Sequence, residues 1–365
     1  MAPPQSQFDI SPEKEASQLR FLYRQFLAKT KEVDRDHVDL RGKTAIITGS
    51  NTGLGLETAH QLLDLGLSRL IMAVRNVPKA ELARESLLRR HRPGSSSRAI
   101  AIDIWKLDLS SYRSVVELAE RAKGLDRLDL AVLNAGLYKL KEEFNPQTGF
   151  DEDVQVNYLS NSLLMVLLLP ILQRTTQPPA APGGGGRLVL VSSDTACWAK
   201  FEERHARPLL GAFRQKTPGW SMGERYGTSK LLGQFFFRRL AARSGSGSGS
   251  GSAATPTLVA VNPGMCYGSE LAREGDGSLA GRLFGVVQRV VGKPPRLGAL
   301  AIVHAAVSFD HRAAHGQYVE DGLLRPMAPI HYKPEGDAIS KQIWEETLAE
   351  LEFARVRDIV QQMGI

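Results

Sequence analysis

The stretch Thr44-Ala45-Ile46-Ile47-Thr48-Gly49-Ser50-Asn51-Thr52-Gly53-Leu54-Gly55 decides the fold of this chain. Its first five residues are apolar or β-branched and predict a short buried strand. The apolar pattern that follows, over residues 54–66, predicts a helix. A glycine-rich turn between a strand and a helix presents backbone N–H groups and the positive end of the helix dipole to a phosphate group. The stretch therefore predicts a pyrophosphate site.

Strand and helix patterns alternate along the rest of the chain. Strands are predicted over residues 44–48, 69–74, 99–103, 128–133, 187–192, 257–261 and 317–320. Helices are predicted over residues 54–66, 78–91, 112–123, 151–173, 223–243, 279–291 and 296–308. The strands are nearly continuous apolar runs, which is typical of strands buried on both faces. This alternation predicts an α/β fold: a doubly wound, Rossmann-type parallel sheet of about seven strands in a single domain.

A tyrosine and a lysine stand four residues apart within the predicted helix 223–243. Tyr226 and Lys230 would lie on one helix face, one turn apart. A free phenol titrates near ~10, and a neighbouring ammonium group favours its ionised form. The pair could serve as a proton donor and acceptor, although the same spacing also occurs by chance on exposed helices. Of all the tyrosines in the chain, only Tyr226 has a lysine four residues later.

These motifs together resemble the short-chain dehydrogenase/reductase superfamily. Gly49, Gly53 and Gly55 match its TGxxxGxG spacing, and the match covers roughly residues 40–330. The runs Ser50–Gly55 and Ala73–Asn76 are similar to the retinol-dehydrogenase-like group, which includes many fungal reductases of secondary metabolism. The resemblance implies reversible hydride transfer between a nicotinamide cofactor and a ketone, aldehyde or alcohol.

The resemblance also assigns roles to four residues. Ser193, the second serine after the fifth strand, is expected to orient the substrate carbonyl. Tyr226 is expected to pass a proton to the carbonyl oxygen, while Lys230 lowers the pKa of that tyrosine and binds the ribose. Asn157 is expected to organise a water that leads to the lysine; otherwise it is a polar residue that interrupts a helix.

NADP(H) is the expected cofactor. No Asp or Glu lies between Leu70 and Lys79, where NAD-binding folds usually place an acid, and Arg75 could clamp a 2′-phosphate. The alternative is an exposed arginine at a strand end. The expected cofactor-binding residues are Gly49, Asn51, Thr52, Gly53, Leu54, Gly55, Arg75, Asp108, Asn134, Tyr226, Lys230, Pro263, Gly264 and Ser269, the last in place of a threonine that is usual in the family. No metal ligands are assigned.

A lipophilic small-molecule carbonyl or alcohol is the expected substrate. The segment 194–224 separates Ser193 from Tyr226 by about twice the length usual in the family. It contributes the residues Trp198, Phe201, Phe213, Trp220 and Met222. Together with an apolar pattern over residues 265–291, it could wall a substrate pocket, although ordinary core packing would use the same residues. The alternative function is a catalytically silent NADP-binding sensor or scaffold.

The amino-acid composition of the chain limits the binding partners that are expected. The net charge of +7 comes from scattered Lys and Arg residues, so no nucleic-acid partner is expected. Two cysteines make no disulfide framework and fit a reducing, cytoplasmic setting. Residues 1–40 are interpreted as an N-terminal helical extension, 41–330 as the NADP-binding catalytic domain, and 331–365 as a C-terminal helical extension. The helix predicted over residues 12–31 is amphipathic, so membrane contact is expected to be at most peripheral. A homo-oligomer remains open.

Overall fold

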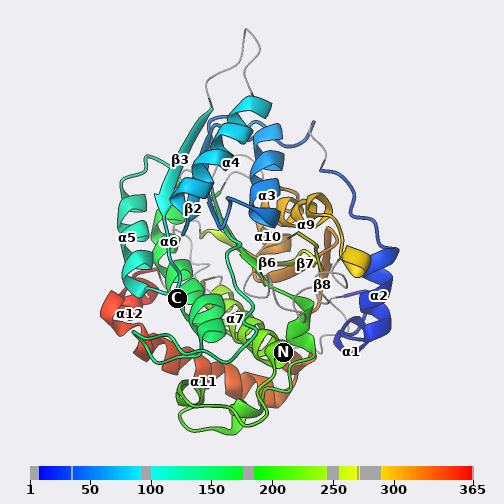
Figure 1. Ribbon diagram of the computed structural model, residues 1–365, viewed down its shortest axis with the longest axis vertical. Helices are drawn as coiled ribbons and strands as arrows, with labels where there is room; N and C mark the ends of the chain where they lie inside the picture. The colour runs from blue at the N-terminus through cyan, green and yellow to red at the C-terminus, as the bar shows by residue number, and fades with distance from the viewer. Residues whose placement is uncertain are drawn as a thin grey trace.

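A computed structural model describes residues 8–33, 36–91, 100–175, 185–244, 255–268, 271 and 289–363. These residues contain one eight-stranded sheet in the order β3-β2-β1-β4-β5-β6-β7-β8 (Figure 1). The strands are β1 (Thr44–Thr48), β2 (Arg69–Val74), β3 (Ala101–Lys106), β4 (Leu130–Leu133), β5 (Arg187–Val191), β6 (Thr257–Asn262), β7 (Gln317–Glu320) and β8 (Leu323–Arg325). Strands β1 to β7 pair in parallel, which confirms the predicted single-domain, doubly wound α/β fold.

The eighth strand was not predicted. It pairs antiparallel with β7 through the two-residue turn Asp321-Gly322. Both turn residues have positive φ, 49° and 76°, as a tight hairpin turn of type I′ requires. The Asp-Gly pair was the available signal, but a strand of three residues carries too little apolar pattern to stand out.

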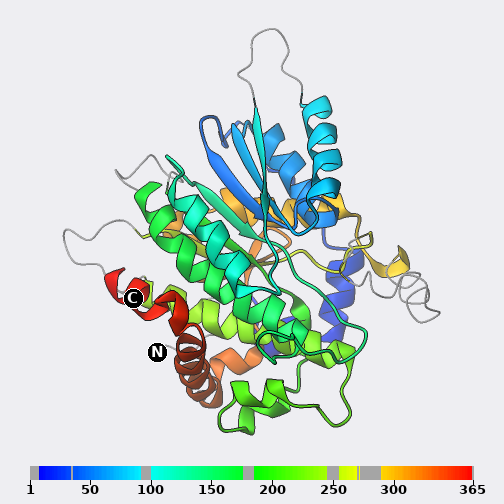
Figure 2. The same cartoon turned by 60° about the vertical axis from the view of Figure 1, so that its left-hand side comes forward.

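Helices cover both faces of the sheet (Figure 2). One face carries α3 (Gly53–Asp64), α4 (Val77–Arg90) and α9 (Pro295–Val307), with the short α10 (His311–Ala314) beside β6 and β7. The other carries α5 (Tyr112–Lys123), α6 (Asn161–Thr175) and α7 (Met222–Ser244). Outside this layer, α11 (Pro334–Glu350) packs on α7, and α12 (Val356–Gln362) packs on α6.

The strand side chains divide between two apolar cores because successive residues of a strand point to opposite faces. Ile46 belongs to the core under α5, α6 and α7, whereas Ala45 and Ile47 belong to the core under α3, α4 and α9. Trp344 extends the first core outward, since it is buried and stacks on Phe236 of α7 at 5.1 Å between ring centroids.

Two predicted helices have different boundaries in the structure. The helix expected over residues 12–31 is two shorter helices, α1 (Pro12–Glu15) and α2 (Gln18–Phe26), because Ser11 and Ser17 each cap a new helix start. The helix expected over residues 151–173 begins with a π-helical segment, Val154–Ser160, that continues into α6. Within the described residues, Val154–Thr175 is the only helix apolar and long enough to cross a membrane, and it lies almost wholly inside the core. Most of the helix predicted over residues 279–291 lies outside the described residues.

Candidate active site

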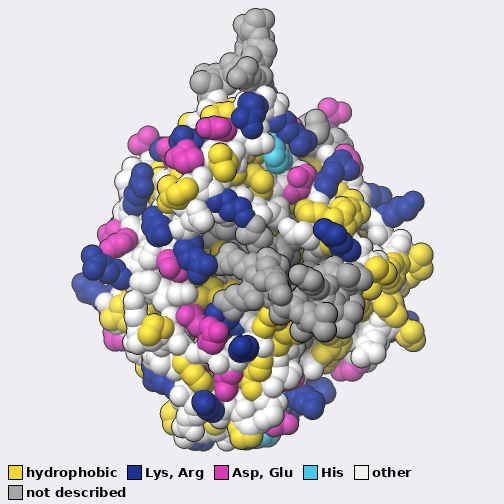
Figure 3. Space-filling view, in the orientation of Figure 1, with side chains coloured by type: hydrophobic (Ala, Val, Ile, Leu, Met, Phe, Trp, Pro, Cys, Tyr) yellow, Lys and Arg dark blue, Asp and Glu magenta, His cyan; other side chains and the backbone are white. Residues whose placement is uncertain are grey.

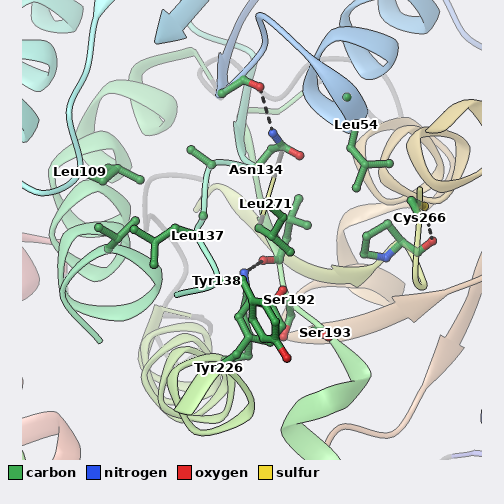
Figure 4. A pocket seen from close by; sticks show the side chains of 18 of the residues that line it. Leu54, Leu109, Asn134, Leu137, Tyr138, Ser192, Ser193, Tyr226, Cys266 and Leu271 are labelled. Carbon is green, nitrogen blue, oxygen red and sulfur yellow. Dashed lines mark hydrogen bonds between the residues drawn. The ribbon is translucent and has the colours of Figure 1, made fainter. Parts of the chain in front are cut away.

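A cavity of about 620 Å³ runs along the edge of the sheet where the parallel strands end. Residues from the ends of β1 to β6 line it, together with side chains from α2, α3, α7 and the loop before the π-helical segment (Figure 4). Parallel pairing puts these strand ends at one edge, so residues separated by more than 200 positions in the sequence meet there.

The glycine-rich turn forms one end of this cavity. Gly49 and Gly53 have positive φ of 66° and 52°, which residues with a Cβ rarely adopt. A Cβ at Gly55 would collide with the carbonyl oxygen of Gly49 and lie 2.7 Å from Nδ2 of Asn134. Thr52 begins α3 without a side-chain cap, so the N–H groups of the first helical turn face the cavity without a capping side chain.

Asn134, one of the expected cofactor-binding residues, follows β4 and holds the turn in place. Its Nδ2 donates to the backbone oxygens of Thr48, at 2.9 Å, and Gly49, at 3.4 Å. The N–H of Ala135 donates to Oγ1 of Thr48 at 2.8 Å. These three hydrogen bonds tie the end of β4 to the end of β1 across the point where the strand order reverses.

Arg75 and Asp108 lie beside this turn. Arg75 follows β2, is exposed, and lines the cavity with Asn76 and Lys79. Asn76 caps α4 by accepting from the N–H of Lys79 at 2.9 Å. Asp108 follows β3, lines the cavity, and accepts from the N–H of Ser110 at 3.1 Å. Backbone donors at α3 and a guanidinium at the end of β2 are the groups that a phosphorylated dinucleotide needs, so the residues present fit the expected cofactor.

Ser193 and Tyr226 lie together at the other end of the cavity (Figure 4), and Lys230, one turn after Tyr226 on α7, also lines it. The side chain of Ser193 lies beside that of Tyr226 and acts to lower the pKa of the phenol, against the effect of burial. Nζ of Lys230 lies 5.6 Å from the centre of the Tyr226 ring and donates to the carbonyl oxygen of Val191 at 3.1 Å. Ser192 also lines the cavity, but its Oγ accepts from Nε2 of Gln234 at 3.1 Å, which separates its role from that of Ser193.

Burial dominates the electrostatics of this group. It raises the pKa of Tyr226, and the nearby Tyr138 and Asp153 raise it further. Burial also lowers the pKa of Lys230 to about 8, although Asp153 acts in the opposite direction. The net shift of the Tyr226 pKa is upward, because loss of hydration around the buried phenol is its largest cause; the expected lowering of this pKa by Lys230 stays a prediction.

Asn157, in the middle of the π-helical segment, connects two parts of the site by hydrogen bonds. Its Nδ2 donates to the carbonyl oxygen of Leu137 at 2.9 Å and to Oγ of Ser229 at 3.0 Å, and its Oδ1 accepts from the N–H of Leu137 at 2.9 Å. The Asn157 amide thus links the loop after β4 to α7. It contacts α7 at Ser229, the residue before Lys230. Gly136 packs directly on it, since a Cβ there would lie 2.8 Å from Oδ1 of Asn157.

The turn after β6 closes the cavity from a third side. Pro263 and Gly264 line the cavity, and the N–H of Gly264 donates to Oδ1 of Asn262 at 3.1 Å. Gly264 has a positive φ of 74°. The N–H of Tyr138 donates to the carbonyl oxygen of Leu271 at 3.1 Å, which brings the chain after this turn back across the cavity (Figure 4). Ser269 lies outside the described residues.

The aromatic residues of segment 194–224 divide between the cavity and the core. Trp198 lines the cavity, but Phe201 and Phe213 are completely buried in the core under α7. Both alternatives that the sequence left open therefore occur in this segment: Trp198 lines the cavity, and the two phenylalanines pack in the core. Three short 3₁₀ turns, Asp194–Cys197, Glu202–His205 and Leu210–Arg214, fold this segment back onto the domain and bury its phenylalanines.

Sequence reasoning missed the contribution of the N-terminal segment. Phe21 of α2 lines the cavity and meets Trp198 edge-to-face at 5.3 Å between ring centroids. Nε1 of Trp198 donates to the carbonyl oxygen of Ala16 at 2.8 Å. The available signal was the spacing of Phe21, Arg24 and Gln25, which places all three on one helix face.

Comparison with known proteins agrees with this geometry. A family profile described as short chain dehydrogenase matches residues 43–202. The short-chain dehydrogenase fogG of Aspergillus ruber is 51% identical over 361 residues, which cover 98% of each chain. The short chain dehydrogenase/reductase mfmJ of Annulohypoxylon moriforme is 38% identical over 345 residues, 94% of each chain. This chain belongs to the short-chain dehydrogenase/reductase family.

Solved structures show the same fold. A protein from Mycobacterium paratuberculosis matches the dehydrogenase with a TM-score of 0.60 at 22% identity, covering 88% of this chain and 98% of that one. A short chain dehydrogenase from Shigella flexneri complexed with NADP matches with a TM-score of 0.53 at 20% identity, covering 80% and 100%. These structures show the fold, and membership of the short-chain dehydrogenase/reductase family makes the chain an oxidoreductase.

The contact between Gly136 and Asn157 leads to a testable prediction. Gly136→Ala should lower the free energy of unfolding of the dehydrogenase by about 1–3 kcal/mol, because the new methyl group has to displace the Asn157 amide from its bonds to Leu137 and Ser229. Urea denaturation of the cofactor-free protein measures this. Gly124→Ala is the matched control, since a Cβ there meets its nearest atom at an ordinary 3.5 Å. Equal stabilities of the two variants would contradict the prediction.

Proposed function

We propose that this dehydrogenase interconverts a ketone or aldehyde and an alcohol on a lipophilic small molecule, with NADP(H) as cofactor. One observation carries the proposal: a single cavity holds an uncapped helix N-terminus and Arg75 at one end and Ser193, Tyr226 and Lys230 at the other. The first end suits a phosphorylated dinucleotide. The second suits proton transfer to a carbonyl oxygen.

Each residue at the second end has a distinct task in the proposed reduction. The nicotinamide supplies the hydride when it is bound. The Ser193 hydroxyl donates a hydrogen bond to the substrate carbonyl oxygen and so orients the carbonyl carbon. The Tyr226 hydroxyl gives its proton to that same oxygen, and the Lys230 ammonium stabilises the phenolate left behind. Asn157 keeps the Leu137 loop and α7 at the spacing that these contacts need.

The lining of the cavity favours an apolar substrate. Its apolar lining residues include Phe21, Leu137, Val156, Trp198, Met265 and Leu271. Among the polar lining residues, Ser193 and Tyr226 are the two whose hydroxyls the proposal assigns to the substrate oxygen. Both relatives compared above are fungal, which supports a role for the enzyme in fungal secondary metabolism.

We place the enzyme in the cytoplasm, without a nucleic-acid partner. On the face seen in Figure 3, Lys and Arg side chains alternate with Asp and Glu side chains instead of forming a basic patch. The outer side of α2 exposes Leu19, Leu22, Tyr23, Phe26 and Leu27. This side would carry any peripheral membrane contact or a contact between copies of the chain.

Substitution of Tyr226 tests the catalytic assignment. Tyr226→Phe should lower kcat by roughly 100-fold or more, since it removes the proton donor, while NADPH binding remains. The assay follows NADPH oxidation against a panel of aromatic, terpenoid and polyketide ketones, with small polar ketones and sugars as controls. A variant that keeps a tenth of the wild-type kcat would exclude Tyr226 from this role. Wild-type protein that binds NADPH but reduces none of the panel would instead support a silent sensor or scaffold.

Substitution of Arg75 tests the cofactor preference. Arg75→Ala should weaken NADPH binding relative to NADH binding by about 1.5–3 kcal/mol, or roughly 10- to 150-fold, because a charged hydrogen-bonding partner of the 2′-phosphate is lost. Titration of cofactor fluorescence measures both dissociation constants. Arg89→Ala, at an exposed position on α4, is the control and should change neither. Equal binding of NADPH and NADH by the wild type would refute the preference.

The pH dependence of ketone reduction tests Lys230. Its pKa of about 8 means that the ammonium form is lost above pH 8, so kcat should be nearly constant from pH 6 to 7.5 and fall at higher pH. Burial and the neighbouring Asp151 raise the pKa of Asp153 to about 8 as well, which makes Asp153→Asn the necessary control. Because Asp153 raises the pKa of Lys230, this variant should keep the alkaline decline and move its midpoint to lower pH. Loss of the decline in Asp153→Asn would assign it to Asp153 instead.

A further inference from the structure

Helix α2 carries Arg24 into a buried group of carboxylates beside the active site. Nη1 of Arg24 lies 2.8 Å from Oε1 of Glu15, Nη2 lies 3.3 Å from Oδ2 of Asp194, and Nε lies 3.2 Å from Oε1 of Glu320. All four side chains are at most 10% exposed. Arg24 thus joins the N-terminal segment to the residue after Ser193 and to the last residue of β7.

Asp194 connects this group to Ser193. Oγ of Ser193 lies 3.5 Å from Oδ1 of Asp194, a contact long enough to leave the hydroxyl proton available for the substrate oxygen. It also accepts from the backbone N–H of Thr195 at 3.2 Å and from Oγ1 of Thr195 at 2.9 Å. The Ser193 hydroxyl is therefore held by the turn that Asp194 begins, and one oxygen of Asp194 faces Ser193 while the other faces Arg24.

The protonation states of the buried carboxyl groups around Arg24 depend on its guanidinium. Burial raises the pKa of both Asp194 and Glu320, and Arg24 acts against it in each case. Asn262 also acts against the effect of burial, since its Nδ2 donates to Oε1 of Glu320 and it lowers the pKa of Asp194. Without the guanidinium, two buried carboxyl groups would face each other with no cation between them, so they would take up a proton or move apart. Either change acts on the turn that holds Ser193.

The rest of α2 is attached to the same edge of the cavity. Nε2 of Gln25 donates to the carbonyl oxygens of Met265, at 2.7 Å, and Val291, at 2.9 Å. Oε1 of Gln25 accepts from the N–H of Met265 at 3.3 Å. Phe21, one turn earlier, lines the cavity. One face of this helix therefore contacts the active-site edge at three positions, 21, 24 and 25.

We infer that Arg24 is a positioning residue for the reaction: through Asp194 it holds the Ser193 hydroxyl in reach of Tyr226 and of the substrate oxygen. The inference rests on the proposed function, in which Ser193 orients the carbonyl. If Arg24 has this role, the N-terminal segment contributes to catalysis, although Arg24 is 169 positions from Ser193 in the sequence.

A double-mutant cycle tests this coupling. Arg24→Gln should lower kcat for ketone reduction by about tenfold or more and leave the Kd of NADPH within threefold, because the glycine-rich turn and Arg75 are not touched. In a Ser193→Ala background the same substitution should lower kcat by less than twofold, since the hydroxyl that it positions is already gone. An equal loss of kcat in both backgrounds, or no loss in either, would overturn the inference.

Two further variants separate positioning from stability. Arg24→Lys keeps the charge and should recover part of the lost kcat. Arg20→Gln removes the neighbouring, half-exposed partner of Glu15 and should leave kcat unchanged. If Arg24→Gln does not fold, Asp194→Asn breaks the same link from the other side and enters the same cycle with Ser193→Ala. Additive losses there count against the inference, and non-additive losses support it.

Hydrogen exchange gives a readout that needs no turnover. Arg24→Gln should speed amide exchange in residues 192–198 while exchange in α11 stays as in the wild type. Unchanged exchange in residues 192–198 would overturn the inference, as would equal acceleration in α11. This measurement also separates the two proposals: wild-type protein that reduces no ketone refutes the proposed function, and the exchange pattern still decides whether Arg24 orders the Ser193 turn.

Discussion

The parallel pairing of β1 with both β2 and β4 is the constraint on which the rest of the site depends. The strand order reverses at this point, so the loops after β1 and β4 leave the sheet in different directions and open a crevice between them. The glycine-rich turn fills one side of the crevice, and the amide of Asn134 crosses it to bond Thr48 and Gly49. A side chain larger than hydrogen at Gly55 would push these two strand ends apart.

Burial is the second constraint. It shifts the pKa values of the site residues, in addition to its part in core packing. Tyr226 and Lys230 lie on α7 under the loop after β4, where little water remains to solvate an ion. Burial therefore destabilises the charged form of each residue, which raises the pKa of the phenol and lowers that of the ammonium group to about 8. The same effect acts on Asp194 and Glu320, where Arg24 offsets it. The hydrogen bonds of Asn157 keep the peptide groups around these charges satisfied.

The two ends of the chain are built into the domain in different ways. The C-terminal helices α11 and α12 add apolar side chains such as Trp344 and Val360 to the core under α6 and α7, away from the cavity. The N-terminal helix α2 contacts the cavity edge through Phe21, Arg24 and Gln25 and leaves its other side exposed. An amphipathic pattern in the sequence could not tell these two outcomes apart, because it states that one face is covered without stating what covers it.

The sequence by itself determined the features that rest on local spacing. The glycine-rich turn, the order of strands and helices, the Tyr226–Lys230 pair and the positions of Asn134 and Ser193 after their strands all follow from patterns within a few residues, and the structure brings these residues to one edge of the sheet. Only the tertiary structure decided the rest: the burial of Phe201 and Phe213, the π-helical setting of Asn157, the upward shift of the Tyr226 pKa, and the contact of Arg24 with Asp194, 170 positions away. Each of these features depends on desolvation and on contacts between segments far apart in the chain. Neither can be inferred from the local spacing of residues.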